Sequence, residues 1–475
     1  MYKINKYILL LGLSSAVISC KVPAITKLAN NKVSPKFYGL PSDSNNVATI
    51  PYQSFFTDKN LVNLIDTALK NNQELQITLQ EIEIARNDVK FRQGELLPSV
   101  IAGIGAGVEK VGRYTSQGAG DASTEITPGK PVPDALTDIT LAASANWEVD
   151  VWKKLHNAKK AAISRYLASV EGKNFVVTNL VAEVANSYYE LLSLDNQLAV
   201  VKQNIAIQKN ALEIIKVQKE AARETELAVQ KFKAEVFNSE SLEFDILQKI
   251  KETENKINFL LARYPQEIPR DKTDFLTLIP SKILSGIPSQ LLNNRPDIKQ
   301  AELELTAAKL DVKVARAEFY PSLGISATAG FQAFKPSFLF KFPESVLYSL
   351  AGDLAGPLIN RNTIKAAYNT ANAMQLEALY NYQKTVLNAY MEVSNQLSNV
   401  SNLEKSYDLK SKEVDALTKS ITISNDLFKS ARADYLEVLL TQRDALSSKL
   451  ELIETKQQQF NAITAIYQQL GGGWR

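Results

Sequence analysis

The chain has 475 residues, a formal net charge of +3, one histidine and one cysteine. The near-balance of 54 basic and 51 acidic residues argues against a general nucleic-acid-binding protein, which needs a basic surface. With only His156 and Cys20, no intramolecular disulfide can form, and a zinc site or imidazole catalysis is disfavoured. We therefore expect no catalytic residue, no metal site and no enzymatic activity.

The first twenty residues predict a lipoprotein signal peptide over residues 1–19. Lys3 and Lys6 precede a short apolar stretch, and the small Ser19 stands directly before Cys20. About twelve apolar residues are too few to span a bilayer as a helix. The segment Val17–Cys20 resembles the bacterial lipobox, which implies a covalent lipid on Cys20 as the only bound group and a lipidated extended segment over residues 20–57. The alternative is an ordinary secretory signal with an incidental cysteine.

Glycine-rich segments with alternating side chains predict β-strands. Eight of the 19 glycines lie between Gly94 and Gly129. Large and small or polar residues alternate over 139–147 and again over 323–332, which is the period of a strand. Each strand has an expected partner across a loop: a long polar loop over 112–133, and a loop rich in Phe and Pro over 334–343, followed by a strand over 346–353. Strands of about ten residues suit tilted transmembrane β-strands.

Two long segments predict helical hairpins with coiled-coil packing. Residues 173–264 and 358–470 contain neither Gly nor Pro. In the first segment, twelve positions follow a 4,3 spacing and ten of them are apolar, which predicts a rod of roughly 60 Å. These positions are Val177, Leu180, Val184, Ser187, Leu191, Leu194, Leu198, Val201, Ile205, Gln208, Leu212 and Ile215.

The two halves of the chain are related by an internal repeat. Asn71, Glu95 and Pro98-Ser99 match Asn294, Glu318 and Pro321-Ser322 at a constant offset of 223 (294 − 71). Further along, residues 186–190 resemble residues 388–392. We therefore predict one repeat over 58–270, with its hairpin at about 98–147, and a second over 285–475, with its hairpin at about 321–355. Four strands in one chain do not close a barrel, so closure demands an oligomer, and three copies give twelve strands.

Three segments carry a family resemblance: residues 430–439 with Gln442-Arg443, residues 470–474, and residues 294–298. They are similar to the outer membrane efflux protein family, the TolC-type channels, within its lipid-anchored branch. The resemblance implies a mainly α fold with a transmembrane β-barrel, formed by a homotrimer with a twelve-stranded barrel and an α-helical periplasmic tunnel. It also implies a passive, gated exit duct in the outer membrane of a Gram-negative bacterium, with a periplasmic adaptor and an inner-membrane pump as partners.

The resemblance also assigns site residues. It places the gate and ion selectivity at Glu437, with Asp434 and Arg432 beside it, whereas a second acidic position of the family falls on Leu440 here. Adaptor contacts fall on the two turns between long helices, Ala221, Ala222, Arg223, Ser430 and Ala431. The alternative for Glu437 is a solvated helix residue, and the alternative for the turn residues is a tight helical turn with solvated charges.

Other interpretations of the chain remain open. A periplasmic adaptor or structural lipoprotein without a pore explains the lipobox and the heptads, but not the two related hairpins. An enzyme would need a nucleophile elbow, metal motif or phosphate loop, and the sequence shows none of these. The aromatic residues Trp147, Trp152, Phe319 and Tyr320 flank the predicted strands and suit either an interfacial belt or ordinary packing.

Overall fold

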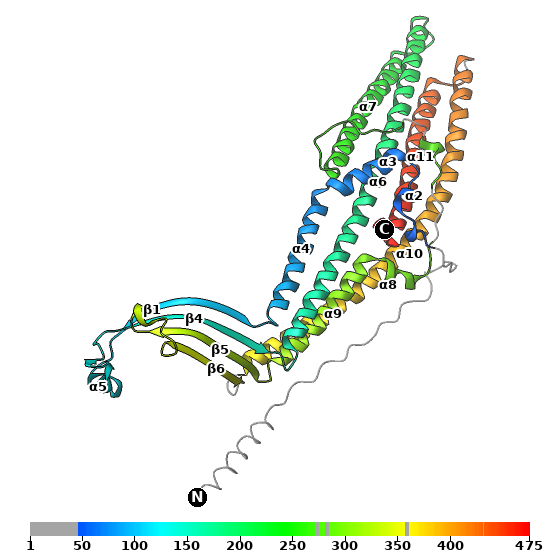
Figure 1. Ribbon diagram of the computed structural model, residues 1–475. Coiled ribbons are helices and arrows are strands. Elements are labelled where there is room, and N and C mark those ends of the chain that lie inside the picture. Colours follow the sequence, from blue (N-terminus) through cyan, green and yellow to red (C-terminus); the bar gives the residue numbers. More distant parts are fainter. Residues whose placement is uncertain (1–45, 272–274, 281–284, 357–360, 431) are drawn as a thin grey trace. The chain divides into compact units, whose positions relative to one another are not determined.

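The computed structural model describes residues 46–271, 275–280, 285–356, 361–430 and 432–475 (Figure 1). The predicted signal peptide, Cys20 and Ala431 lie outside these residues. The chain forms two compact units, each of which collects segments from both halves of the sequence. The helical unit contains residues 46–83, Leu167–Glu302 and Tyr380–Arg475, and the sheet unit contains Ile84–Tyr166 and Leu303–Leu379.

The main helices occur in pairs of nearly equal length, one member in each half of the chain. α4 (Gln73–Gly94) and α9 (Pro296–Ala317) have 22 residues each, and α7 (Glu226–Leu260) and α11 (Tyr435–Gln469) have 35 each. α6 (Lys154–Glu220) has 67 residues and α10 (Asn362–Lys429) has 68. The predicted long helical hairpins are therefore confirmed. Within the described residues, no helix is both long and apolar enough to cross a membrane.

Shorter helices precede and connect these pairs. α3 (Lys59–Asn71) follows η1 (Val47–Thr49) and α2 (Tyr52–Phe55) at the start of the described chain. The connection between the two halves contains η2 (Phe275–Thr277), η3 (Pro288–Gln290) and α8 (Leu291–Asn294).

The helix starts establish how the two halves correspond. Between α4 and α9 the offset is 223 (296 − 73), whereas between α7 and α11 it is 209 (435 − 226). The predicted match of residues 186–190 with residues 388–392 has an offset of 202, so it is wrong by one heptad. A heptad pattern matches itself after such a shift. Similarity between coiled-coil segments therefore did not determine the correct register.

Four strands form one antiparallel sheet in the order β1-β4-β5-β6 (Figure 1). They are β1 (Ser99–Glu109), β4 (Leu136–Val149), β5 (Ser322–Ala333) and β6 (Val346–Ala355). β1 pairs with β4 so that Ser99 lies opposite Asn146, and β5 pairs with β6 so that Ser322 lies opposite Ala355. Both predicted hairpins are confirmed, and β1 and β6 are the edges of the sheet.

The first loop has more structure than the polar loop that the sequence predicted. It contains α5 (Ser116–Ser123), capped by the Thr115 hydroxyl, and a small hairpin of β2 (Glu125–Thr127) and β3 (Lys130–Pro131). Asp134 closes the base of the loop with ion pairs to Arg113 (2.7 Å) and Lys110 (3.3 Å). The hydrogen bond from Lys110 and the charge of Arg113 hold the pKa of Asp134 below its ordinary value.

The main core lies in the helical unit and contains most of the predicted heptad positions. Eleven of the twelve are buried, and the remaining one, Leu198, is partly buried against the same core. Tyr188 is fully buried, and its hydroxyl donates to Asp58, whose carboxylate also caps the first turn of α3. Burial of a tyrosine with a satisfied hydroxyl stabilises this junction between α3 and α6.

The aromatic residues near the strand ends divide into two groups. Phe319 is buried and makes an edge-on contact with Tyr368 at 5.8 Å, so it belongs to a packed cluster. Trp152 stacks on Tyr320 at 4.6 Å and remains 46% exposed, while Trp147 is 38% exposed. Only the second group has the exposure that an interfacial belt requires.

Candidate functional site

In the turn between α6 and α7, the C-terminal cap of α6 is followed almost at once by the N-cap of α7. The backbone N–H of Arg223 donates to Gln218 and that of Ala222 to Lys219, both at 2.9 Å, which is the Schellman pattern. Ala222 has a φ of 53°, the left-handed conformation that glycine usually supplies. Thr225 then caps α7 by accepting from the Ala228 N–H at 3.2 Å. Alanine thus adopts here a turn conformation for which glycine is the usual residue.

Charged groups around this turn are paired locally. Glu226, in the first turn of α7, forms an ion pair with Lys219 and accepts from the Gln230 amide at 2.6 Å. The Gln230 hydrogen bond and the Lys219 ammonium hold the pKa of Glu226 below its ordinary value. Ala221, Ala222 and Arg223 are exposed, and Arg223 has no ion pair with any residue that the structure describes. This guanidinium is therefore free for contact with another molecule.

The turn between α10 and α11 repeats the same local pattern. The Arg432 N–H donates to the Leu427 carbonyl at 2.9 Å, and the Ser430 hydroxyl donates to the Asp426 main-chain carbonyl at 2.8 Å. Asp434 is the N-cap of α11 and accepts from the Leu436 N–H at 2.8 Å. Asp434, predicted beside the gate, therefore has a structural role in starting the helix.

Glu437 projects from the first turn of α11, one residue before a buried contact. Val438 is 2% exposed and packs with residues of α6 and α7. Glu437 itself is exposed, as is Arg432, and neither makes an ion pair within the described part of the chain. An ion pair between Arg432 and Glu437 is therefore not made within one copy in this conformation.

One small hydrophobic cluster joins both hairpin tips within the helical unit. We call it the apical cluster; its buried members are Leu212, Ile215, Ala228, Val229, Phe232, Val236 and Val438. Phe428 and Tyr435, on either side of the second turn, pack against it. Because this cluster holds Val438, it sets the position at which Glu437 leaves the helix surface.

A polar layer separates the apical cluster from the main core. It consists of three buried polar residues on three helices, Gln208, Ser239 and Gln442, which are 1–3% exposed. On α6, Gln208 lies between Ile205 of the main core and Leu212 of the apical cluster, and α7 and α11 follow the same order. Neither amide atom of Gln208 has a hydrogen-bond partner among the described residues. Gln208 was visible in the sequence as a polar heptad position, but its two counterparts were not identified.

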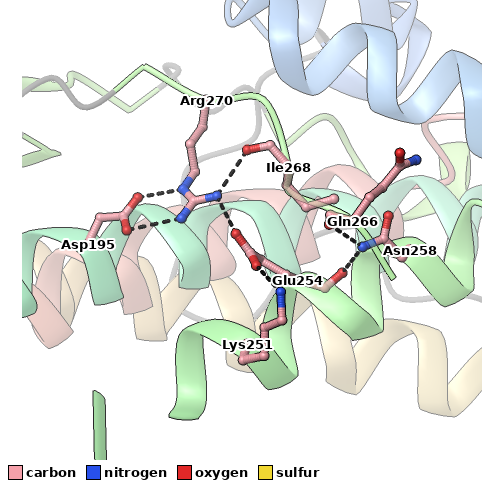
Figure 2. Close-up of polar contacts among 7 residues, drawn as sticks. All are labelled: Asp195, Lys251, Glu254, Asn258, Gln266, Ile268 and Arg270. Atoms are coloured by element: carbon pink, nitrogen blue, oxygen red, sulfur yellow. Dashed lines mark hydrogen bonds and ion pairs between the residues drawn. The ribbon is translucent and has the colours of Figure 1, made fainter. Parts of the chain in front are cut away.

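A buried arginine fixes the segment that follows α7 (Figure 2). Arg270 makes two hydrogen bonds to Asp195 of α6, at 2.5 and 3.1 Å, and one to Glu254 of α7 at 2.9 Å. Its side chain is 6% exposed. Although burial alone favours the neutral form, the hydrogen bonds to the two carboxylates raise the pKa of Arg270. No sequence pattern indicated this cluster, because its three members lie on separate segments of the chain.

A second buried arginine starts α9. Arg295 donates two hydrogen bonds to the Asp297 carboxylate, at 3.0 and 2.7 Å. It also donates to the Glu392 carboxylate and to the Gln469 carbonyl, at 2.9 Å each. In the first half, Asn72 donates to the Leu260 carbonyl at 3.0 Å. Leu260 and Gln469 are the last residues of α7 and α11. In each half, a side chain at the start of the shorter helix, α4 or α9, therefore bonds the carboxyl end of the corresponding longer helix, α7 or α11.

The described residues offer no candidate metal centre. The structure shows no group of three or more His, Cys, Asp or Glu side chains that could hold a metal ion there. Instead it presents two exposed turns, one exposed carboxylate on a fixed helix, and a sheet with two open edges. These features suit contact and passage.

Comparisons with known proteins agree with this conclusion. The family model described as outer membrane efflux protein matches residues 64–263 and 287–472. The pyoverdine export outer membrane protein OpmQ of Pseudomonas aeruginosa is 27% identical over 87% of this chain and 85% of its own. The solvent efflux pump outer membrane protein SrpC of Pseudomonas putida is 26% identical over 92% and 91%. The open state of the MtrE outer membrane channel of Neisseria gonorrhoeae superposes with a TM-score of 0.83 at 20% identity, covering 96% of this chain and 99% of that one.

Proposed function

This chain belongs to the outer membrane efflux protein family, and we propose that three copies of it form a passive duct through the outer membrane. Its relatives are outer membrane efflux proteins and not enzymes, and the predicted fold class agrees with that of the solved channels. In the proposed assembly, a pump in the inner membrane supplies the energy, and a periplasmic adaptor connects the pump to the duct. Lipid on Cys20 anchors each copy.

The observation that carries this proposal is the sheet with two unpaired edges. β1 exposes Val100, Ile101, Ile104 and Val108, each 67–79% accessible in the single chain. β6 exposes Tyr348, Leu350 and Leu354, each 72–84% accessible. Open edges with apolar side chains are unstable in water, and unpaired backbone groups are costlier still in lipid. Pairing β1 of one copy with β6 of the next satisfies both edges, and three copies of four strands give a closed ring of twelve.

We further propose that Glu437 lines the constriction of this duct. Three copies would place three exposed carboxylates at one level, which attracts cations and repels anions. Glu437→Gln removes the charge and keeps the size, and Glu454→Gln makes the same change at an exposed acid on another face of the same helix. We expect Glu437→Gln to reduce cation selectivity and Glu454→Gln to leave it unchanged. Equal selectivity in the wild type and Glu437→Gln would remove Glu437 from the gate.

The turns are the proposed adaptor contacts. Ala221, Ala222 and Arg223 are exposed at the first turn, and Ser430 is exposed at the second, with Ala431 beside it in the sequence. Small side chains allow close approach of a partner helix, and the free guanidinium of Arg223 is suited to an acidic partner residue.

Single-channel conductance in a planar bilayer, measured together with the mass of the purified oligomer, tests the duct. A trimer with stepwise conductance supports the proposal. A monomer that does not conduct would contradict it and favour the adaptor or structural lipoprotein.

A further inference from the structure

The loop between β5 and β6 differs in chemistry from the other loop of the sheet. Residues 334–345 contain four phenylalanines, two lysines and one acidic residue, Glu344. Residues 110–135 contain one aromatic residue, Tyr114, with three basic and three acidic side chains. Phe340 and Phe342 are 69% and 78% exposed. One loop is thus polar and neutral, whereas the other is aromatic and basic.

The aromatic loop is internally fixed. η4 (Pro336–Phe338) begins it, and the backbone N–H of Lys341 donates to Phe338 at 3.0 Å. Ser345 is buried at the centre, where its N–H donates to Lys341 at 2.9 Å and its carbonyl accepts from Gln332 at 2.8 Å. A fixed loop loses little conformational entropy when it binds, so its exposed rings are preorganised for contact.

The rings and lysines of the loop are interleaved. Phe334 packs on Phe338 at 5.2 Å and Phe331 on Phe340 at 5.6 Å, so one set of rings supports the other. The Lys341 ammonium lies 4.7 Å from the centre of the Phe338 ring, and the Lys335 ammonium lies 5.7 Å from that of Phe334.

Neither lysine is neutralised by the described part of the chain. The structure shows no ion pair between Lys335 or Lys341 and a carboxylate there. Exposed aromatic rings beside uncompensated ammonium groups match an amphiphile with an apolar body and an anionic head.

The loop lies at the opposite end of the strands from α9 and α10. It joins Ala333 of β5 to Val346 of β6, whereas the other ends of these strands lead to α9 and α10 (Figure 1). Strands of 12 and 10 residues extend roughly 35 Å, enough for a tilted crossing of a bilayer. On the proposed function, on which this step rests, the helices lie in the periplasm and the loop meets the outer leaflet.

We propose that this loop is a docking element for phosphate-bearing lipid of the outer leaflet. Phe340 and Phe342 enter the acyl region, and Lys335 and Lys341 bind the lipid phosphates as point charges. The other loop, neutral and with a single aromatic residue, lacks both contributions. The loop between β5 and β6 therefore fixes the depth of the duct in the membrane and selects anionic lipid around it.

The test measures binding of lipid A, and of lipid A with its phosphates removed, to the full-length detergent-purified protein by native mass spectrometry. Two double variants address the two parts of the proposal. The lysine variant, Lys335→Gln with Lys341→Gln, tests phosphate binding, and the phenylalanine variant, Phe340→Ser with Phe342→Ser, tests insertion into the acyl region. The control, Tyr114→Ser with Lys130→Gln, makes the same kinds of change in the other loop. We expect the lysine variant to lose about 30-fold in affinity for lipid A, since each lysine near an anionic surface contributes about a factor of five. The control variant is expected to bind as the wild type does.

Three outcomes would overturn the proposal. Unchanged lipid A binding by the lysine variant, or equal binding of lipid A without phosphates, removes phosphate recognition. If the phenylalanine variant lowers the heat resistance of the oligomer while its lipid binding is unchanged, the rings contact a second copy of the chain instead. Conductance measured on the same samples separates these results from failure of the duct itself, because a loop variant that still conducts leaves the proposed function intact.

Discussion

Two buried arginines show how single residues hold the segments between long helices. Arg270 and Arg295 each lie between two carboxylates and also donate to a main-chain carbonyl. A buried charge is stable only when partners replace its lost hydration. Each arginine therefore serves as a fixed point for the chain segment that carries it.

Replacing Arg270 by methionine is expected to destabilise the protein strongly. The change leaves Asp195 and Glu254 largely buried, at 14% and 8% side-chain exposure, without their shared cation. Breaking such a buried pair costs about 3–5 kcal/mol. Lys251→Met is the matched control, because Lys251 contacts the same Glu254 but is 59% exposed, and an exposed partner contributes about 0–1 kcal/mol. Denaturant unfolding in detergent measures both, and equal losses in the two variants would refute this role for Arg270.

Ala222 offers the opposite test, since glycine there is expected to stabilise the protein. Its φ of 53° is unfavourable for a residue with a Cβ, by roughly 1 kcal/mol. Ala222→Gly should therefore raise the free energy of unfolding by about 0.5–1 kcal/mol. In contrast, Ala206→Gly, at an exposed position inside α6, should lower it by up to about 1 kcal/mol. A destabilised Ala222→Gly variant would mean that the left-handed turn does not persist in solution.

At the scale of elements, the sequence predicted the long helices and both hairpins, because each rests on a pattern local to its segment. Heptad spacing and the absence of Gly and Pro located α6 from residue 173 onward, and alternation located β4 and β5. The folded first loop was missed because α5 is an eight-residue helix that contains two glycines and has no apolar period. Its closure depends on Asp134 meeting Lys110 and Arg113 from the far end of the loop.

The candidate site was predictable only in part, because a local sequence pattern does not reveal contacts between distant segments. The family motif located the two turns and Glu437, and the structure shows those turns to be exposed. The cap formed by Asp434 depends on where α11 begins, which the motif alone did not settle. The polar layer and the arginine clusters depend on contacts between helices far apart in the chain, and no local pattern encodes them.

The polar layer predicts a stability change that is specific to one face of α6. Gln208 is buried with both amide atoms unpaired among the described residues, and leaving such groups unpaired costs about 1–3 kcal/mol. Gln208→Met, which keeps the length of the side chain, is therefore expected to stabilise the helical unit by about that amount. The exposed Gln203→Met should change it by less than about 0.5 kcal/mol. Thermal unfolding followed by circular dichroism distinguishes them, and a destabilised Gln208→Met variant would show that water or a neighbouring copy satisfies the amide.

At the scale of the whole molecule, the internal repeat predicts how neighbouring copies pair. Ser99 of β1 corresponds to Ser322 of β5, an offset of 223 (322 − 99), and Asn146 of β4 corresponds to Ala355 of β6, an offset of 209 (355 − 146). Within one copy, β4 pairs with β5. If the ring of strands repeats this pairing between copies, β6 of one copy meets β1 of the next in the same register.

This register places Leu350 opposite Val108 of the next copy. Leu141 lies opposite Phe331 in the β4–β5 pair, and the two offsets convert these positions to 350 (141 + 209) and 108 (331 − 223). Both side chains are exposed in the single chain, at 78% and 68%, so the predicted contact buries two apolar residues against each other. Opposed residues in antiparallel strands have Cβ atoms about 5 Å apart, close enough for a disulfide with little adjustment.

A chain with Val108→Cys and Leu350→Cys is therefore expected to form disulfide-linked trimers under mild oxidation, seen on a non-reducing denaturing gel. The control combines Val108→Cys with Leu354→Cys, which moves the second thiol about 13 Å along β6 on the same face of the strand. Single-cysteine variants establish the background from Cys20. Cross-linking in the control and not in the matched pair would mean that the register between copies differs from the register within a copy. Because each copy carries one thiol for either neighbour, a closed ring of three stops at the trimer, whereas an open or larger assembly gives a ladder beyond it.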